Sequence, residues 1–262
     1  MFRQIARSVF ILIMALPAAR AQSPGRSDAP AIPVAEIIQK MAAKETEFRA
    51  ARENYTYHQA VHVQEFTASG RPGGEYRRVS DIVFTPEGRR FEHVSYEPPA
   101  TLELVSMSPE DTRDLISIQP FVLTSDDLPL YDLQYEGRTK IDEIGTYVFR
   151  ASPKRVEKGH RYFEGTIWVD DQDLQIVKTD GKAVPDLRRK DGENLFPRFE
   201  TYRENIEGKY WFPTYTRADD VLHFKSGDVR IRMMVRYTDY KRFTVTARIL
   251  TPGSEETKPP EN

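Results

Sequence analysis

Alternation of apolar and polar side chains with a period of two runs through the chain from Tyr55 onward, and it restricts the fold more than any other feature. The clearest stretch is 229–237, where apolar residues hold the odd positions and Arg230, Arg232 and Arg236 lie among the even ones. A strand of this kind buries one face and leaves the other in water or in ion pairs. We expect the arginine row to be a solvated face with acidic partners on neighbouring strands; an anion or lipid headgroup site is the alternative.

About twelve segments carry strand patterns, and short turn clusters such as 69–74 and 170–173 separate many of them. The expected strands are 56–67, 76–84, 90–97, 101–107, 131–140, 146–152, 161–169, 174–180, 199–206, 210–217, 229–240 and 243–250. Linkers this short join antiparallel neighbours, because parallel neighbours need a crossover of about a dozen residues or more. The sequence therefore predicts a mainly β protein built on an antiparallel sheet.

A first helix is expected at 34–53, where apolar residues recur at helical spacing and Pro33 is a favourable first residue. The apolar stripe of this helix consists of Val34, Ile37, Ile38, Met41 and Phe48. Such a stripe has to pack on another element, so we expect this helix to cover part of the sheet.

A second helix is expected to begin after Ser108, because Ser108, Pro109 and Asp111 form a capping box with proline at the first helical position. It continues through 112–118 and stops before Pro120. The apolar segment 120–129 has no clear period and is expected to lie as a flap across one side of the sheet.

The N-terminus has the three parts of a secretory signal peptide: Arg3 and Arg7, the apolar run 9–16, and a small-x-small site at 19–21. A short membrane anchor is the alternative, but eight residues of helix span only ~12 Å of a hydrocarbon core of about 30 Å. The chain contains no cysteine, so a lipid-modified cysteine and disulfides are both excluded. We expect a secreted protein without a lipid anchor or a membrane span.

The remaining chain is expected to form one domain. We predict a signal peptide at 1–21, a flexible lead-in at 22–33, a single domain at 34–250 and a disordered tail at 251–262. The 38 basic residues nearly balance the 40 acidic ones, which gives no reason to expect nucleic acid as a partner.

Motifs of catalytic chemistry are missing from the sequence. His58 and His62 lie on an expected strand, where four residues span about 13 Å, too far to share a metal ion. We find no nucleophile elbow, zinc-protease motif or phosphate-binding glycine loop. No catalytic residue, metal or cofactor is therefore assigned, and the chain is not expected to be an enzyme, although a carboxylate dyad from distant strands stays open.

Aromatic residues crowd 162–169 and 210–215, and the alternation places large apolar groups on both faces of these strands. A strand that is apolar on both sides needs cover on both sides. The helices and the 120–129 flap can supply it, and a ligand groove can share the same surface.

The stretch 163–170, which ends in Trp168-Val169-Asp170, is followed by 174–178 and resembles the central hairpin of the LolA/LolB-like lipoprotein-carrier superfamily. The strand at 210–213 is similar to one in related outer-membrane lipoprotein-sorting proteins. The resemblance implies an incomplete antiparallel half β-barrel covered by two or three helices. It also implies a periplasmic protein that holds acyl chains on a concave apolar face.

On this resemblance we expect a periplasmic binding protein for a lipid, an acyl chain or a lipoprotein, with a possible role in outer-membrane biogenesis. Tyr162, Trp168, Trp211 and Tyr215 are the candidate lining of the groove. A sensor or interaction module with envelope protein partners is the alternative, and an envelope hydrolase on the same scaffold is a third reading.

Overall fold

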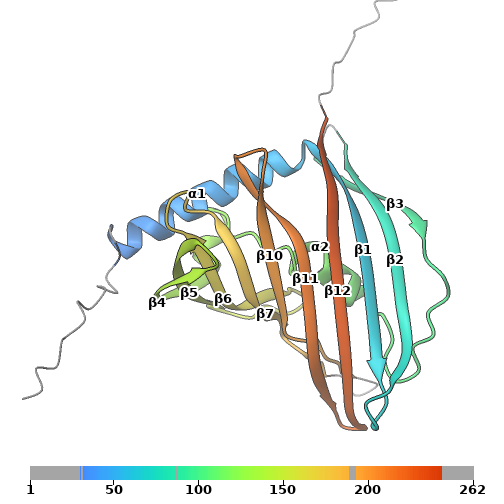
Figure 1. The fold of residues 1–262 in the computed structure, drawn as a ribbon. Helices are drawn as coiled ribbons and strands as arrows, with labels where there is room; N and C mark the ends of the chain where they lie inside the picture. The colour runs from blue at the N-terminus through green and yellow to red at the C-terminus, as the bar shows by residue number, and fades with distance from the viewer. Residues whose placement is uncertain (1–29, 31, 86–87, 189–192, 244–262) are drawn as a thin grey trace, which may run out of the picture.

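The period-two pattern folds as one large antiparallel sheet in the computed structural model, which describes residues 30, 32–85, 88–188 and 193–243. The strands of this sheet are β1 (Tyr55–Phe66), β2 (Pro72–Phe84), β3 (Arg90–Tyr96), β4 (Tyr131–Ile141), β5 (Ile144–Pro153), β6 (Tyr162–Asp170), β7 (Ile176–Val184), β10 (Phe199–Ile206), β11 (Tyr210–Phe224) and β12 (Gly227–Arg242). Their spatial order is β3-β2-β1-β12-β11-β10-β7-β6-β5-β4 (Figure 1).

The sheet curves but does not close. Its two edge strands, β3 and β4, lie at opposite ends of the strand order and do not pair with each other. Every pair of neighbours is antiparallel, as the short turns predicted. The fold is mainly β, an antiparallel half-barrel, and this part of the prediction is confirmed.

Both expected helices are present, as α1 (Val34–Arg52) and α2 (Pro109–Ser117), and both lie on the concave side of the sheet. Figure 1 shows α1 crossing the sheet near one end of the strands. Ile37, Met41 and Phe48 are buried along its stripe, as the helical spacing predicted. The capping box of α2 is formed, because Ser108 accepts from the amide of Asp111 and the carboxylate of Asp111 accepts from the amide of Ser108.

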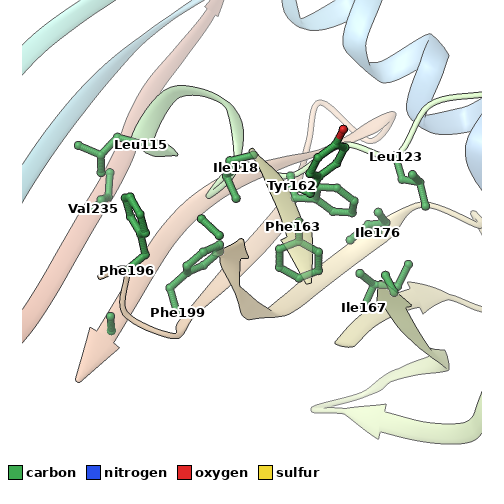
Figure 2. Packing of buried hydrophobic residues seen from close by; sticks show 14 of the residues in the cluster. Leu115, Ile118, Leu123, Tyr162, Phe163, Ile167, Ile176, Phe196, Phe199 and Val235 are labelled. Carbon is green, nitrogen blue, oxygen red and sulfur yellow. The ribbon is translucent and has the colours of Figure 1, made fainter. Parts of the chain in front are cut away.

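Side chains from the sheet and from its helical cover fill the middle of the concave side. Phe163 and Ile167 of β6 are fully buried there, and the predicted flap adds Phe121 and Leu123. The rings of Phe121 and Phe163 stack with centroids 4.5 Å apart. Figure 2 shows this packing from β6 and β7 across to Phe196 and Phe199, so the space between helices and sheet is largely occupied by the protein itself.

Some sequence predictions do not match the structure. The segment 101–107 is not a strand, because the amides of Glu103, Leu104 and Val105 bond to the side chain of Glu65 instead of a neighbouring strand. A hairpin of β8 (Leu187–Arg188) and β9 (Glu193–Asn194) was not predicted. A short 3-10 helix, η1 (Leu128–Leu130), ends the flap.

The expected signal peptide, the strand 243–250 apart from its first residue, and the tail 251–262 lie outside the described residues. The division of the chain at these boundaries therefore stays a prediction. Within the described part, no helix is long and apolar enough to cross a membrane.

Candidate ligand-binding cleft

An open cleft of about 880 Å³ lies at the end of the concave side away from α1. One wall comes from the ends of β1, β11 and β12, and the facing wall comes from 102–108 and the start of α2. The β8–β9 hairpin borders it. The apolar lining consists of Val63, Leu102, Leu104, Val105, Met107, Leu187, Leu195, Pro197, Leu222, Phe224 and Ile231. This volume falls within the range of about 300–1,000 Å³ typical of small-molecule sites.

We call residues 102–107 of the facing wall the strap. One buried carboxylate holds the strap in place. Glu65 on β1 is 2% exposed, and its oxygens accept backbone N–H groups of the strap. Glu103 donates at 2.8 Å, Leu104 at 2.9 Å and Val105 at 3.2 Å, and Gly74 of β2 adds a fourth N–H at 3.3 Å. Hydrogen bonds from several amides stabilise a buried carboxylate, so Glu65 fixes the strap over the cleft.

Gly74 allows the chain to pass close to this tether. A Cβ atom at this position would lie 1.9 Å from the carbonyl oxygen of Thr101. The amide of Thr101 donates to the carbonyl of Glu75, and the hydroxyl of Thr101 accepts from the amide of Glu75. Only glycine permits this approach, which brings the start of the strap against β2.

The start of α2 is fastened to the β8–β9 hairpin. Asn194 donates to the Ser108 hydroxyl at 2.6 Å, and the Ser108 hydroxyl lies 2.6 Å from the Asp111 carboxylate. Burial raises the pKa of Asp111, although hydrogen bonds from Ser108 oppose this shift. The polar contacts thus hold the two sides of the cleft mouth together.

The middle of α2 is pinned by an ion pair. Asp114 and Arg161 lie 2.7 Å apart, with side chains 5% and 10% exposed. The Arg161 guanidinium also lies over the Phe196 ring, 3.6 Å from its centroid. Burial raises the pKa of Asp114, and the Arg161 contacts only partly offset that shift. Opening of α2 would have to break this buried pair.

A smaller cavity of about 50 Å³ continues the cleft beneath α2. The two spaces share lining residues, which include Val63, Met107 and Ile231. The inner cavity is bordered mostly by apolar side chains, and its polar border consists of Asp111, Asp114 and Gln119. The side-chain oxygen of Gln119 is buried and accepts no hydrogen bond. The cleft therefore leads from a polar mouth into an apolar interior.

The mouth carries charge of both signs. Glu103, Glu110 and Glu193 line it together with Lys225. Glu193 is paired with Arg188 and accepts the amide of Lys225 at 2.7 Å. The backbone hydrogen bond from Lys225 is the main cause that lowers the pKa of Glu193, which keeps this carboxylate ionised at the rim.

The four aromatic residues predicted as groove lining do not lie together. Tyr162 is 7% exposed and packs in the concave cluster, where its ring meets that of Tyr131 (Figure 2). Trp168 alternates with the buried Ile167 and Val169 and so lies on the outer face. Trp211 donates its indole N–H to Asp173 at the β6–β7 turn, 3.2 Å away. A role of these side chains in binding stays a prediction.

On the outer face of the sheet, a lysine side chain covers part of the aromatic surface. Lys178 lies 4.9 Å from the Trp168 ring centroid and 4.8 Å from that of Tyr202. Tyr215 lines a separate outer hollow beside Arg217. Lys178 therefore covers the Trp168 and Tyr202 rings through cation–π contacts.

The arginine row of β12 has the acidic partner expected of a solvated face. Asp219 on β11 lies 2.8 Å from Arg230 and 3.0 Å from Arg232. The hydrogen bond from Arg230 is the first cause that lowers the pKa of Asp219. The interpretation as a charge-paired surface is confirmed for these two arginines.

The histidines also meet acidic partners on the sheet. His58 lies 3.0 Å from Asp81, and His62 lies 2.8 Å from Glu75. Among residues 30, 32–85, 88–188 and 193–243, no group of three or more His, Asp or Glu side chains is placed to hold a metal ion.

Sequence reasoning missed the residues that shape the cleft. Glu65 occupies an inward position of β1, between Val63 and the turn, where a carboxylate breaks the apolar pattern. Glu45 likewise interrupts the apolar stripe of α1. A charged residue at an inward position is the signal that could have marked both.

Solved structures similar to this chain are known, at low identity. A DUF1329 family protein from Desulfovibrio piger is 15% identical with a TM-score of 0.40, and the match covers 80% of this chain and 93% of that one. A LolA superfamily protein from Nitrosomonas europaea is 15% identical with a TM-score of 0.34, covering 84% and 98%. An outer membrane lipoprotein-sorting protein domain from Vibrio parahaemolyticus is 12% identical with a TM-score of 0.35, covering 78% and 93%.

A LolA superfamily protein is thus among the solved structures to which this chain is similar, as the sequence resemblance led us to expect. No family model matches the sequence, and no curated protein matches it. At these identities and TM-scores, function has to be inferred from the residues of this chain.

Proposed function

We propose that the protein binds the acyl chain of a lipid or lipoprotein in the cleft between the strap and the ends of β1, β11 and β12. The observation that carries the proposal is about 880 Å³ of open space, with apolar side chains on both walls and a polar mouth, that leads into a smaller, mostly apolar cavity. An amphiphile matches this arrangement, because its tail gains about 0.8 kcal/mol for each CH₂ group removed from water.

The cleft walls have one apolar cluster of their own. Leu195, Leu222, Val229 and Ile231 pack together at this end of the sheet, with Val105 of the strap and Phe224 against them. Leu104 of the strap is 52% exposed, although it is a large apolar residue beside this cluster. An exposed apolar side chain at the rim of an apolar cleft is a feature of ligand sites.

The strap and α2 would form the movable side. They are held by the Glu65 tether, by the Asp114–Arg161 pair and by the packing of Leu115 in the core, whereas the opposite wall is continuous sheet. In this proposal the protein works in the periplasm, accepts an acyl chain there and passes it to a binding partner of higher affinity.

The experiment is a titration of the purified protein with fluorescent fatty acids of increasing chain length. Affinity should rise with length until the cleft is filled, by up to about a factor of four for each added CH₂ group. Leu104→Asp should weaken binding about tenfold or more, because it places a charge where the tail lies. Val221→Asp is the matched control, since Val221 is 38% exposed on β11 and faces away from the cleft.

The same titration tests the aromatic residues predicted from the sequence. If the ligand lies in the cleft, Trp168→Ala leaves the affinity unchanged. Equal affinity of wild type and Leu104→Asp, or no uptake at any chain length, would refute the cleft as the binding site.

A further inference from the structure

Gln119 follows α2 and is buried between this helix and the sheet. The residue is 5% exposed. Its backbone amide donates to the carbonyl of Asp114 at 2.9 Å, and its backbone carbonyl accepts from the hydroxyl of Thr201 on β10 at 2.8 Å. Its side-chain nitrogen Nε2 donates to the sulfur of Met233 on β12, 3.1 Å away. Both the backbone and the side chain of Gln119 are therefore fixed.

The contact with Met233 determines which end of the Gln119 amide group meets the sulfur. A thioether sulfur accepts hydrogen bonds weakly and has no hydrogen to donate, so the NH₂ end has to face it. The carbonyl oxygen Oε1 then lies at the other end, where it is buried and receives no hydrogen bond from any described residue. Buried acceptors in proteins are nearly always hydrogen-bonded, so we expect a water molecule or a ligand to supply the donor.

The inner cavity that continues the cleft is bordered by Gln119. Its volume is about 50 Å³, against about 880 Å³ for the cleft. The apolar lining of the inner cavity includes Leu115, Phe196 and Phe199, which are labelled in Figure 2. A cavity of this size and lining accepts a small, mostly apolar part of a ligand and not a charged headgroup.

The inner cavity is rich in hydrogen-bond acceptors. Its polar residues are Gln119 and two carboxylates, Asp111 and Asp114. Each carboxylate already accepts from the chain: Asp111 from the amide of Ser108 at 2.8 Å, and Asp114 from the guanidinium of Arg161 at 2.7 Å. Oε1 of Gln119, by contrast, has no donor within the described residues. The cavity therefore matches a small ligand group that donates a hydrogen bond from apolar surroundings.

We propose that the acyl chain bound in the cleft carries a hydroxyl group remote from its polar end, and that this hydroxyl donates a hydrogen bond to Oε1 of Gln119. The polar end of an amphiphile stays at the charged mouth, so the inner cavity receives a later part of the chain. A hydroxyl suits this place because it is small and neutral and donates one hydrogen bond. The proposal names the occupant of the cleft more closely and therefore rests on the proposed function.

Gln119 would make the cleft selective between chains of equal length. In a wholly apolar cavity a hydroxyl weakens binding, because its hydrogen bonds to water are lost. Beside Gln119 the hydroxyl regains a partner, whereas an unsubstituted chain that fills the cavity leaves the buried oxygen without a donor. Sites that hydrogen-bond a ligand hydroxyl reject the analogue without it more strongly than apolar pockets reject the analogue that has it.

The test is a competition titration in which palmitic acid and its hydroxylated derivatives displace a fluorescent fatty acid. The best of the derivatives hydroxylated in the distal half of the chain should bind about tenfold more tightly than palmitic acid. The derivative hydroxylated next to the carboxyl group should show no such gain, because its hydroxyl stays at the mouth. This comparison uses the wild-type protein alone and does not depend on the folding of a variant.

Gln119→Met removes the acceptor and keeps a side chain of similar length. The distal hydroxyl should then weaken binding about tenfold relative to palmitic acid, so that the preference is reversed. Gln134→Met is the matched control, because Gln134 is exposed on β4, at the other end of the strand order from β1. It should leave the preference of the wild type unchanged. Thermal unfolding checks that both variants are folded.

Two results would overturn the inference and leave the proposed function intact. One is that palmitic acid binds at least as tightly as every hydroxylated derivative, which leaves Oε1 of Gln119 to a buried water molecule. The other is a preference for the distal hydroxyl that persists in Gln119→Met. Failure of the protein to bind any of these fatty acids would refute the proposed function, and the inference with it.

Discussion

Replacement of Arg203 by methionine should destabilise the protein strongly, because it leaves Glu45 without its partner. Arg203 on β10 and Glu45 on α1 have side chains 1% and 0% exposed, and their closest atoms are 3.0 Å apart. The guanidinium bonds both carboxylate oxygens and also donates to the carbonyl of Phe121. The amide of Ile176 on β7 donates to the same carboxylate at 3.1 Å. One buried pair therefore joins α1, the flap and two strands.

The magnitude follows from this burial. Removal of one partner of a buried ion pair costs about 3–5 kcal/mol, because the remaining charge is uncompensated. For a domain of about 150–250 residues each kcal/mol lowers Tm by about 2–4 °C, which gives a loss of roughly 6–20 °C. Arg217→Met is the control: Arg217 is 56% exposed and 2.9 Å from Glu200, and surface pairs of this kind contribute about 0–1 kcal/mol.

The loss should depend on pH in a defined direction. Burial raises the pKa of Glu45 above its ordinary value of 4.5, and Arg203 opposes this shift. Without Arg203 the folded-state pKa rises further above the unfolded one. The penalty is then full above the folded-state pKa and disappears as the pH falls towards the unfolded value, because the carboxyl binds a proton in the folded state.

The assay is urea unfolding at about pH 8 and about pH 5. The difference between Arg203→Met and wild type should be smaller at the lower pH, and adding Glu45→Leu to Arg203→Met should recover most of the loss. A loss below about 1 kcal/mol, or one that is equal at both pH values, would refute the reasoning.

Two further outcomes concern the cleft walls. Glu65→Gln should cost about 1–3 kcal/mol and speed amide hydrogen exchange at Glu103 and Leu104, because a neutral amide accepts their N–H groups less strongly; unchanged exchange would show that the tether does not hold the strap. Ser108→Ala should cost about 1 kcal/mol through the lost cap of α2, measured by thermal unfolding. Ser117→Ala, in the exposed last turn of α2, is the comparison, and an equal effect of both would contradict the capping role.

Most of the strands and both helices could be predicted from the sequence, because the periodicity of apolar residues shows which faces are buried. Alternation placed the strands, and the capping box at Ser108 located α2. The strap was wrongly predicted to be a strand, because its apolar residues follow a strand pattern. Its hydrogen-bond partner, Glu65, lies 38 positions before Glu103 in the chain. A local sequence pattern does not reveal that a backbone segment bonds to a side chain far away in the sequence.

The candidate site was harder to predict than the fold. Aromatic residues on both faces of β6 and β11 gave no sign of which face is concave, and Trp168 lies outside. The cleft is built by chain segments that meet only in three dimensions, such as the strap, the β8–β9 hairpin and the ends of β11 and β12. Its apolar lining is shared among them, and none carries a motif of its own.

The central claim is that the cleft holds an acyl chain, and native mass spectrometry tests it most directly. The protein would be purified without detergent from a bacterial envelope extract, and the bound lipid identified after extraction. We expect a bound lipid or acylated peptide at about one per chain, with occupancy reduced in Leu104→Asp and retained in Val221→Asp. A ligand-free protein that also takes up no fatty acid in solution would contradict the claim.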